Sequence, residues 1–289
     1  MSWSIHHVNL QAHNVRHTTA FLRDMIGLSE GEWVYPPADE MGEIGHDADH
    51  VGYFGSGNRG IHVVLPIATF PRDNGFLHNP TLGGHVAITV PDVHQVASNL
   101  GKAGIPWSDA GTYAMRGVHQ IYCYDPSWNV VEFNQVLETE DWPKGVHPWE
   151  RNWGWGIHHV NLQAIDVRES VGFFTEMAGM SEGRWDAPKQ MGDFSIDPAK
   201  LAILALGEGN RGVHLIEPDA GFAQRNGFAH NPSLGGHPAF WVKDLRTVMA
   251  RLDAAGWPYS DAGVYAMPGM HQIYCLDPSA NMLEINQYV

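Results

Sequence analysis

The amino-acid sequence carries the same pattern twice. Ile5–Ala12 return without a single change as Ile157–Ala164, 152 residues later. Further blocks of the first half recur at the same spacing, namely Gly57–Gly60, Gly83–His85 and His119–Cys123. A repeat of this kind indicates a duplicated architecture. We therefore expect two similar domains, residues 1–136 and 154–289, joined by a linker at 137–153.

Each half divides again into two similar units. A unit opens with a strand that carries a histidine, continues into an amphipathic helix and ends in short, turn-bounded strands. In the first half the two units begin near His7 and His85. This order predicts an α+β fold of four βαβββ units, two in each domain. Each half, at about 145 residues, is long enough to bury a hydrophobic core of its own.

The composition argues against several kinds of partner. The formal net charge is -15, whereas binding to a nucleic-acid backbone needs clustered Lys and Arg. No run of about 18 uncharged apolar residues occurs, so we expect no membrane span. Cys123 and Cys275 occupy equivalent positions in the repeat, which predicts separate thiols in a reduced, cytoplasmic protein. The sequence leaves assembly into a homo-oligomer open.

Histidines gather at the repeated positions, where they form six pairs. Side chains alternate between the two faces of a strand, so alternation sorts these histidines by face. On the first strand His7 shares a face with Ile5 and Asn9, while His6 lies with Val8. We interpret the face of His7 as a functional concavity and His6 as a core residue beside it.

Two histidines and one glutamate in each half fit a metal centre. Glu132 lies within an apolar strand, where a carboxylate is costly unless it is paired or bound to a cation. Two histidines and a carboxylate from three strands leave open positions on a divalent metal, a set that suits non-haem Fe(II). The predicted ligands are His7, His85 and Glu132 in the first half, and His159, His237 and Glu284 in the second. The alternative is that they are buried polar groups bonded to the backbone.

These residues resemble a known family. The segments His7–Ala12, Gly84–Val93 and Asp125–Glu132 are similar to the vicinal oxygen chelate superfamily, whose members pair βαβββ units into cupped sheets around a metal. Four units in 289 residues resemble the type I extradiol ring-cleavage dioxygenases. The resemblance implies catechol-like aromatic substrates, molecular oxygen and a role in aromatic compound catabolism. It implies Fe(II) as the cofactor, with Mn(II), Zn(II) or Ni(II) as alternatives.

The resemblance also implies roles for residues beyond the ligands. It makes His271 a hydrogen-bond donor beside the metal, Tyr274 a residue that orients the catecholate, and His214 the acid–base histidine. The first-half counterparts are His119, Tyr122 and His62. His271 and Tyr274 lie three residues apart on a strand, which predicts opposite faces, so Tyr265 is a spare candidate. Ligands in both halves are a further departure, because extradiol enzymes usually keep them only in the C-terminal half.

Two other functions also fit the sequence. One is a glyoxalase- or epimerase-like lyase or isomerase, in which the metal polarises an enediolate and His62 or His214 supplies a fourth ligand. The other is a small-molecule binding protein of the bleomycin-resistance type, against which the complete ligand sets argue. The leading hypothesis is an Fe(II)-dependent extradiol-type dioxygenase, an oxidoreductase.

Overall fold

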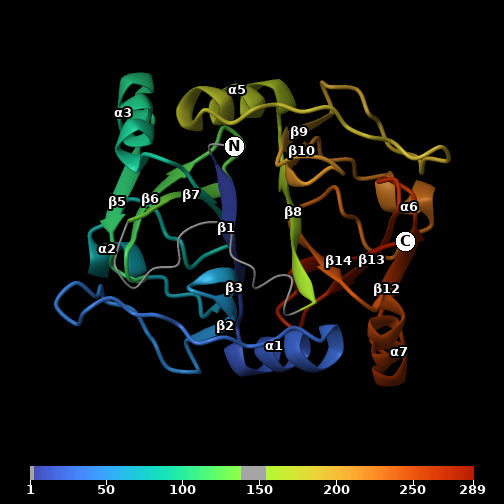
Figure 1. Cartoon of the computed structure of the whole chain (residues 1–289), viewed down its shortest axis with the longest axis horizontal. Helices are drawn as coiled ribbons and strands as arrows, with labels where there is room; N and C mark the ends of the chain where they lie inside the picture. Colours follow the sequence, from blue (N-terminus) through green and yellow to red (C-terminus); the bar gives the residue numbers. More distant parts are fainter. Residues whose placement is uncertain (1–2, 138–153) are drawn as a thin grey trace.

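The computed structural model describes residues 3–137 and 154–289. The described chain forms two seven-stranded mixed sheets that lie side by side, with the longer helices above and below them (Figure 1). The elements of the first half are β1 (Ser4–Gln11), α1 (Val15–Phe21), η1 (Leu22–Ile26), β2 (Val51–Ser56), β3 (Arg59–Val64), α2 (Phe70–Asn74), β4 (His85–Thr89), α3 (Val93–Ala103), β5 (Trp107–Gly111), β6 (Val118–Tyr124) and β7 (Val130–Val136). Those of the second half are β8 (Trp155–Gln163), α5 (Val167–Ala178), β9 (Leu201–Ala205), β10 (Gly212–Ile216), α6 (Phe222–Asn226), β11 (His237–Val242), α7 (Leu245–Ala255), β12 (Tyr259–Gly263), β13 (Met270–Leu276) and β14 (Met282–Tyr288).

Each sheet takes all its strands from one half of the chain. The strand orders are β2-β3-β1-β4-β7-β6-β5 and β12-β13-β14-β11-β8-β10-β9, which are the same order read in opposite directions. At the middle of the first sheet β1 pairs antiparallel with β4, while the outer partners β3 and β7 run parallel to them. The predicted α+β fold of paired units is confirmed.

The first unit of each half departs slightly from the expected pattern. After the opening helix, the strand that should follow is reduced to single bridges, Glu30 with Phe54 and Glu182 with Leu204. The chain from there to β2 or β9 has no regular structure. The second units keep the whole βαβββ order. The irregular segments are important for the site, because they lie at the mouths of the cavities described below.

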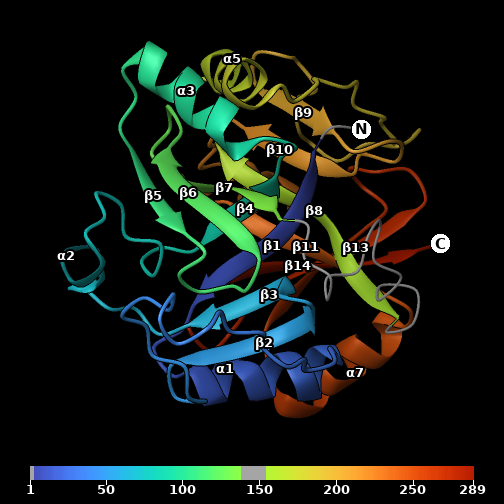
Figure 2. The same ribbon diagram turned by 60° about the vertical axis from the view of Figure 1, so that its left-hand side comes forward.

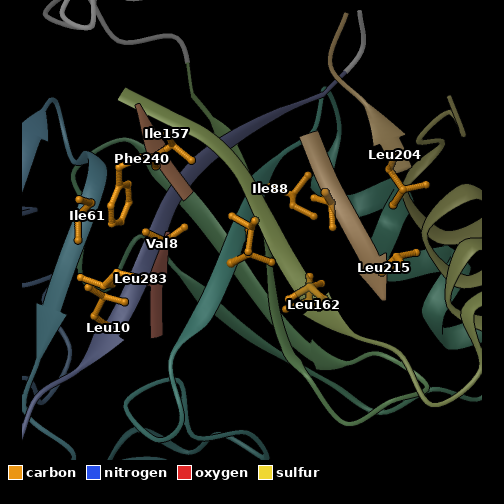
Figure 3. Packing of buried hydrophobic residues seen from close by; sticks show 14 of the residues in the cluster. Val8, Leu10, Ile61, Ile88, Ile157, Leu162, Leu204, Leu215, Phe240 and Leu283 are labelled. Atoms are coloured by element: carbon orange, nitrogen blue, oxygen red, sulfur yellow. The ribbon is translucent and has the colours of Figure 1, made fainter. Parts of the chain in front are cut away.

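The two halves share one hydrophobic core. Val8 of β1 and Ile88 of β4 belong to the same cluster as Ile157 and Leu162 of β8 (Figure 3). Each half is long enough for a core of its own, yet the apolar residues of both halves form one cluster. Apolar residues of one sheet pack against apolar residues of the other sheet. Burial of these two surfaces from water stabilises both halves together. Only small satellite clusters, such as that around Met115, belong to one half.

Helices also pack across the boundary between the halves. Figure 2 shows α3 beside α5, and α7 beside the end of α1, where η1 continues the helix. The Asn99 amide donates to the carbonyl of Met177 at 3.0 Å, and the rings of Phe21 and Trp257 are 5.1 Å apart. After α1 the helix continues as the π-helical turn η1 and ends at Gly27, whose φ of +87° favours glycine.

Three other sequence predictions concern the chain as a whole. Cys123 and Cys275 are free, buried thiols, one in each sheet. Among the described residues, no helix is both long and apolar enough to cross a membrane. The linker predicted at 137–153 falls, apart from Leu137, outside the described residues, so the domain boundaries stay a prediction.

Candidate metal centres

Each centre begins at an irregularity in a strand. The pairing of β1 with β4 skips His6 between Ile5 and His7, so His6 is the extra residue of a β-bulge, and His158 of β8 is skipped in the same way. The bulge breaks the alternation on which the face assignment depended. Ile5 packs against the hydrophobic core and not beside His7. His6 is not simply a core residue either, because its ring is turned to the ring of His7.

The first centre lies where β1, β4 and β7 run side by side. Nε2 of His7 is 3.4 Å from Nε2 of His85 and 3.4 Å from Oε2 of Glu132. Nε2 of His85 is 3.3 Å from the same carboxylate oxygen. All three side chains are at most 3% exposed. Three neighbouring strands therefore bring three potential ligand atoms to one buried point.

The second centre repeats this arrangement on β8, β11 and β14. Oε2 of Glu284 is 3.1 Å from Nε2 of His237 and 3.5 Å from Nε2 of His159. These side chains are also at most 3% exposed. The six residues predicted as ligands are thus brought together as two sets of three.

Both sets fit a divalent metal ion. Two ligand atoms at right angles around an ion with bonds of about 2.1 Å lie about 3.0 Å apart, close to the separations found here. Burial alone would raise the pKa of Glu284, but the imidazoles of His159 and His237 outweigh it and hold that pKa well below its usual range. Two imidazoles and one carboxylate, with the other positions open, form the donor set typical of non-haem Fe(II).

Neighbouring polar groups fix the orientation of the ligands. The carbonyl oxygen of Pro80 lies 3.0 Å from Nδ1 of His85, which leaves Nε2 of that ring for a metal. Around Glu284, the amides of Gln272 and Asn286 donate to Oε1 at 2.9 and 2.8 Å. The sequence reasoning missed these two amides. Strand alternation could have predicted them, because residues two apart on a strand share a face. Gln272 lies two residues from Tyr274, and Asn286 lies two residues from Glu284.

The predicted acid–base histidine lies directly against a ligand. The ring of His214 stacks on the ring of His159 with centroids 3.8 Å apart, and its Nε2 donates to the carbonyl of Asn210 at 2.6 Å. Burial lowers the pKa of His214 well below its usual value, so the ring is neutral and Nδ1 carries the lone pair. His62 has the same stacking and the same carbonyl partner in the first half.

Tyr274 also lies beside the second centre. Its hydroxyl is 2.9 Å from the hydroxyl of Tyr265, and both rings line the cavity above the ligands. Burial, and then the charge of Glu284, raise the pKa of Tyr274 well above its usual value. The phenol therefore stays protonated and can donate a hydrogen bond. Tyr122 occupies the equivalent place in the first half, with Tyr113 as its partner at 3.2 Å.

The structure does not bring His271 and His119 to the centres, and the prediction for these two residues needs correction. Nε2 of His271 is 2.7 Å from Asp261, and Nε2 of His119 is 2.7 Å from Asp109, at partly exposed edges of the sheets. Neither histidine lines the cavity above either centre. The reason is strand alternation, because residues three apart on β13 point to opposite faces and Tyr274 takes the inner one.

The cavities above the two centres differ greatly in size. The second cavity has a volume of about 710 Å³ and reaches from the ligands past Trp185 and Phe194 to Lys200 at its mouth. The first has a volume of only about 60 Å³, with Tyr35 and Leu65 among its walls. A cavity of several hundred cubic ångströms is typical of small-molecule sites. The first is nearer the volume of one or two water molecules.

Solved structures resemble this chain closely in fold but only weakly in sequence. No protein-family model matches the sequence, and no curated protein matches it either. The Mn(II)-bound glyoxalase from Novosphingobium aromaticivorans aligns with a TM-score of 0.56 and 14% identity, over 99% of this chain and 81% of the glyoxalase. The 2,3-dioxygenase LapB from Pseudomonas sp. KL28 aligns with a TM-score of 0.60 and 15% identity, over 99% and 91% of the two chains.

A third neighbour is the 2,2',3-trihydroxybiphenyl 1,2-dioxygenase from Sphingomonas wittichii strain RW1. It has a TM-score of 0.60 and 12% identity, over 99% of this chain and 90% of that one. The alignments thus run through both halves, and the neighbours include catechol dioxygenases as well as a glyoxalase. Together with the cupped sheets and their paired units, they show that this chain has the fold of the vicinal oxygen chelate superfamily.

Proposed function

We propose that the chain is an Fe(II)-dependent extradiol-type dioxygenase, an oxidoreductase that opens a small catechol-like ring with O2 at the second centre. The observation that carries this proposal is the cavity of about 710 Å³ above His159, His237 and Glu284. The first centre has an equivalent ligand set, and we propose that it also binds a metal. Its cavity of about 60 Å³ is too small for an aromatic ring.

The polar lining of the second cavity supports a substrate with hydroxyl groups. Oε1 of Gln272 and Oδ1 of Asn161 are buried and have no hydrogen-bond partner among the described residues. Their amide nitrogens donate to Glu284 and to the carbonyl of Pro232, so the oxygens must be acceptors. Buried acceptors without a donor are costly. Both side chains line the cavity, where hydroxyl groups of a substrate, or water before it binds, are the donors at hand.

The chain's own residues supply binding and proton transfer. When bound, Fe(II) would provide open positions for two hydroxyl oxygens of the substrate and for O2, and would conduct electrons from the substrate to O2. The ring of His214 is neutral and keeps a lone pair on Nδ1, the atom that we propose takes the hydroxyl proton. The protonated phenol of Tyr274 is suited to donate a hydrogen bond to the substrate oxygen that is left after this proton is removed. Trp185 and Phe194 offer aromatic walls for a flat ring.

A lyase or isomerase is the second candidate, because one structural neighbour is a Mn(II)-bound glyoxalase. In that hypothesis His62 or His214 would be a fourth metal ligand. The geometry favours the dioxygenase, since the grouped ligand atoms come from three residues per centre and Nε2 of His214 is bound to a carbonyl. The proposal includes a reduced, cytoplasmic location, which the free thiols of Cys123 and Cys275 support.

The test is metal analysis after anaerobic loading with Fe(II), followed by oxygen uptake with a panel of catechols. We expect close to two iron ions per chain and oxygen consumption that depends on the catechol. Oxygen-independent turnover with nickel or zinc would replace the dioxygenase by the lyase. Catechol binding without turnover under any metal would favour a small-molecule binding protein.

A further inference from the structure

Both centres contain one further histidine that the proposed chemistry does not use. His6 and His158 are each 1% exposed, and each occupies the β-bulge directly before a ligand histidine. A bulge turns a side chain from the face it would otherwise take. As a result, Nδ1 of His6 lies 2.9 Å from Nδ1 of His7, and Nδ1 of His158 lies 2.9 Å from Nδ1 of His159.

The direction of these hydrogen bonds follows from the position of the ligand atoms. His7 and His159 turn Nε2 toward the glutamate, so Nε2 is the atom that a metal would bind. A neutral imidazole with a free Nε2 holds its proton on Nδ1. Because the partner at 2.9 Å is Nδ1 of His6 or His158, that nitrogen must accept the hydrogen bond.

The other histidine ligand of each centre shows which hydrogen-bond partner is usual for Nδ1. Nδ1 of His85 has a backbone carbonyl as its partner, that of Pro80. For Nδ1 of His7, the described residues offer the imidazole of His6 in place of a carbonyl or a carboxylate. The arrangement has a cost in the first half, since Nε2 of His6 is buried without a hydrogen-bond partner among the described residues. The same contact between the two Nδ1 atoms occurs in both halves, which indicates that it has a function.

We propose that His6 and His158 are positioning residues: the Nδ1 lone pair of each accepts the Nδ1 proton of the ligand beside it and keeps Nε2 of that ligand free for the metal. This inference rests on the metal binding that the proposed function includes. It does not depend on which reaction the metal serves. Loss of the acceptor would leave the ligand ring free to rotate or to exchange its tautomer, and metal affinity would fall.

The test compares two substitutions of nearly the same shape, His158→Asn and His158→Leu. The Asn side chain can place Oδ1 where the imidazole has Nδ1, whereas the Leu side chain has no acceptor. Both are made in a Glu132→Gln background, so that a metal reports on the second centre. The probe is Co2+ alone, measured by competition with a chelator and by its visible absorption spectrum, which reports coordination.

We expect His158→Leu to weaken Co2+ binding about 10- to 100-fold and to alter the spectrum, as loss of an outer partner of a ligand does. His158→Asn should keep most of the affinity and the parent spectrum. His230→Leu is the control, because His230 is also buried but its Nδ1 lies 2.9 Å from Ser260, away from the ligands. It should leave Co2+ binding unchanged.

Equal affinities for the Asn and Leu variants, or parental affinity for the Leu variant, would overturn the inference. Should His158→Leu not fold, as judged by circular dichroism, His6→Asn and His6→Leu in a Glu284→Gln background repeat the comparison at the first centre. A parent chain that binds no Co2+ would reject this inference together with the proposed function. A chain that binds Co2+ but never consumes oxygen would reject the function alone.

Discussion

The centre of the first half lies behind a wall of Tyr35, Ile44 and Leu65, whereas the centre of the second half opens into a cavity about twelve times as large. The ligands, the bulged histidine and the stacked histidine occur in both halves. The difference therefore lies in access and not in the metal donor set. Duplication gave two centres, and divergence of their surroundings gave them different capacities for ligands.

Two kinds of sequence change account for the difference in access. Leu65 and Ile67 of the first cavity stand where the second has Glu217 and Asp219, as their shared backbone and side-chain partners show. The loop from residue 33 to 41 is also two residues longer than its counterpart, 185 to 191. It carries Tyr35, whose hydroxyl donates to the carbonyl of His46 at 3.0 Å. These apolar and aromatic groups close the first centre.

The amide oxygens around the two centres also differ, in whether they have a hydrogen-bond partner. In the first half Oε1 of Gln120 accepts a hydrogen bond from Tyr122, and Oδ1 of Asn134 accepts one from Thr89. In the second half the equivalent oxygens of Gln272 and Asn286 have no partner among the described residues. The first half therefore pairs these two amide oxygens within the chain, while the second half leaves both unpaired, and of the two residues Gln272 lines the open cavity.

The largest expected effect comes from removing one carboxylate ligand. Glu284→Ala should lower oxygen uptake with a catechol by more than about 100-fold, because loss of outer partners alone costs 10- to 100-fold. Glu132→Ala should leave most of the uptake intact. Each variant should hold one iron per chain in place of two, measured by metal analysis. Equal losses of activity would contradict the division between the two centres.

The next effect concerns the stacked histidines. His214→Asn should lower kcat with a catechol by about 100-fold or more, a typical contribution of a general base, with little change in iron content. His62→Asn is the matched control and should leave kcat near the parent value. Steady-state oxygen uptake and metal analysis measure both quantities. If His214→Asn loses its iron, the histidine is a ligand and the lyase hypothesis gains support.

Enlarging the first cavity should reduce the difference in catechol binding between the two centres. Leu65 and Ile67 are only partly buried, so Leu65→Ala with Ile67→Ala should be tolerated while the cavity above the first centre grows. We expect the number of bound catechol molecules per iron-loaded chain to rise from one toward two, measured by anaerobic calorimetry. Leu77→Ala, at a side chain 71% exposed, is the control. A stoichiometry that stays at one would show that other groups exclude the ring.

The smallest effect tests a feature common to both halves. Burial raises the pKa of Asp125 to about 6, and it also raises the pKa of Asp277. The folded state therefore holds the proton of Asp125 more tightly than the unfolded state. Its contribution to stability is fully present below about pH 4 and is lost as the pH rises through about 6. Asp125→Asn removes this dependence.

The measurement is urea unfolding of the parent and of Asp125→Asn between pH 4 and pH 7. Relative to the variant, the parent should lose stability by about 1 to 3 kcal/mol across that range. Asp277→Asn should show the same sign, because the two aspartates have equivalent partners in Asn129 and Asn281. A parent that gains stability over the variant with rising pH would contradict the assignment.

The sequence alone determined the duplication, the α+β fold and the six candidate ligands. These features depend on local order and on matching positions, which are visible in a single chain. Alternation also predicted that His271 and Tyr274 face opposite ways, and the structure keeps Tyr274 at the centre. Alternation failed at His6 and His158, because a β-bulge is a property of the pairing between two strands and cannot be seen in one.

Only the tertiary structure decided that the halves share one core and that the two cavities differ in size. Both properties depend on how segments distant in sequence fill space. Val8 and Ile157 belong to one core only because two sheets pack together, and Tyr35 closes the first centre only because a loop folds across it. The ligands were repeated in the sequence, but access to them depends on packing, which the repeat does not encode.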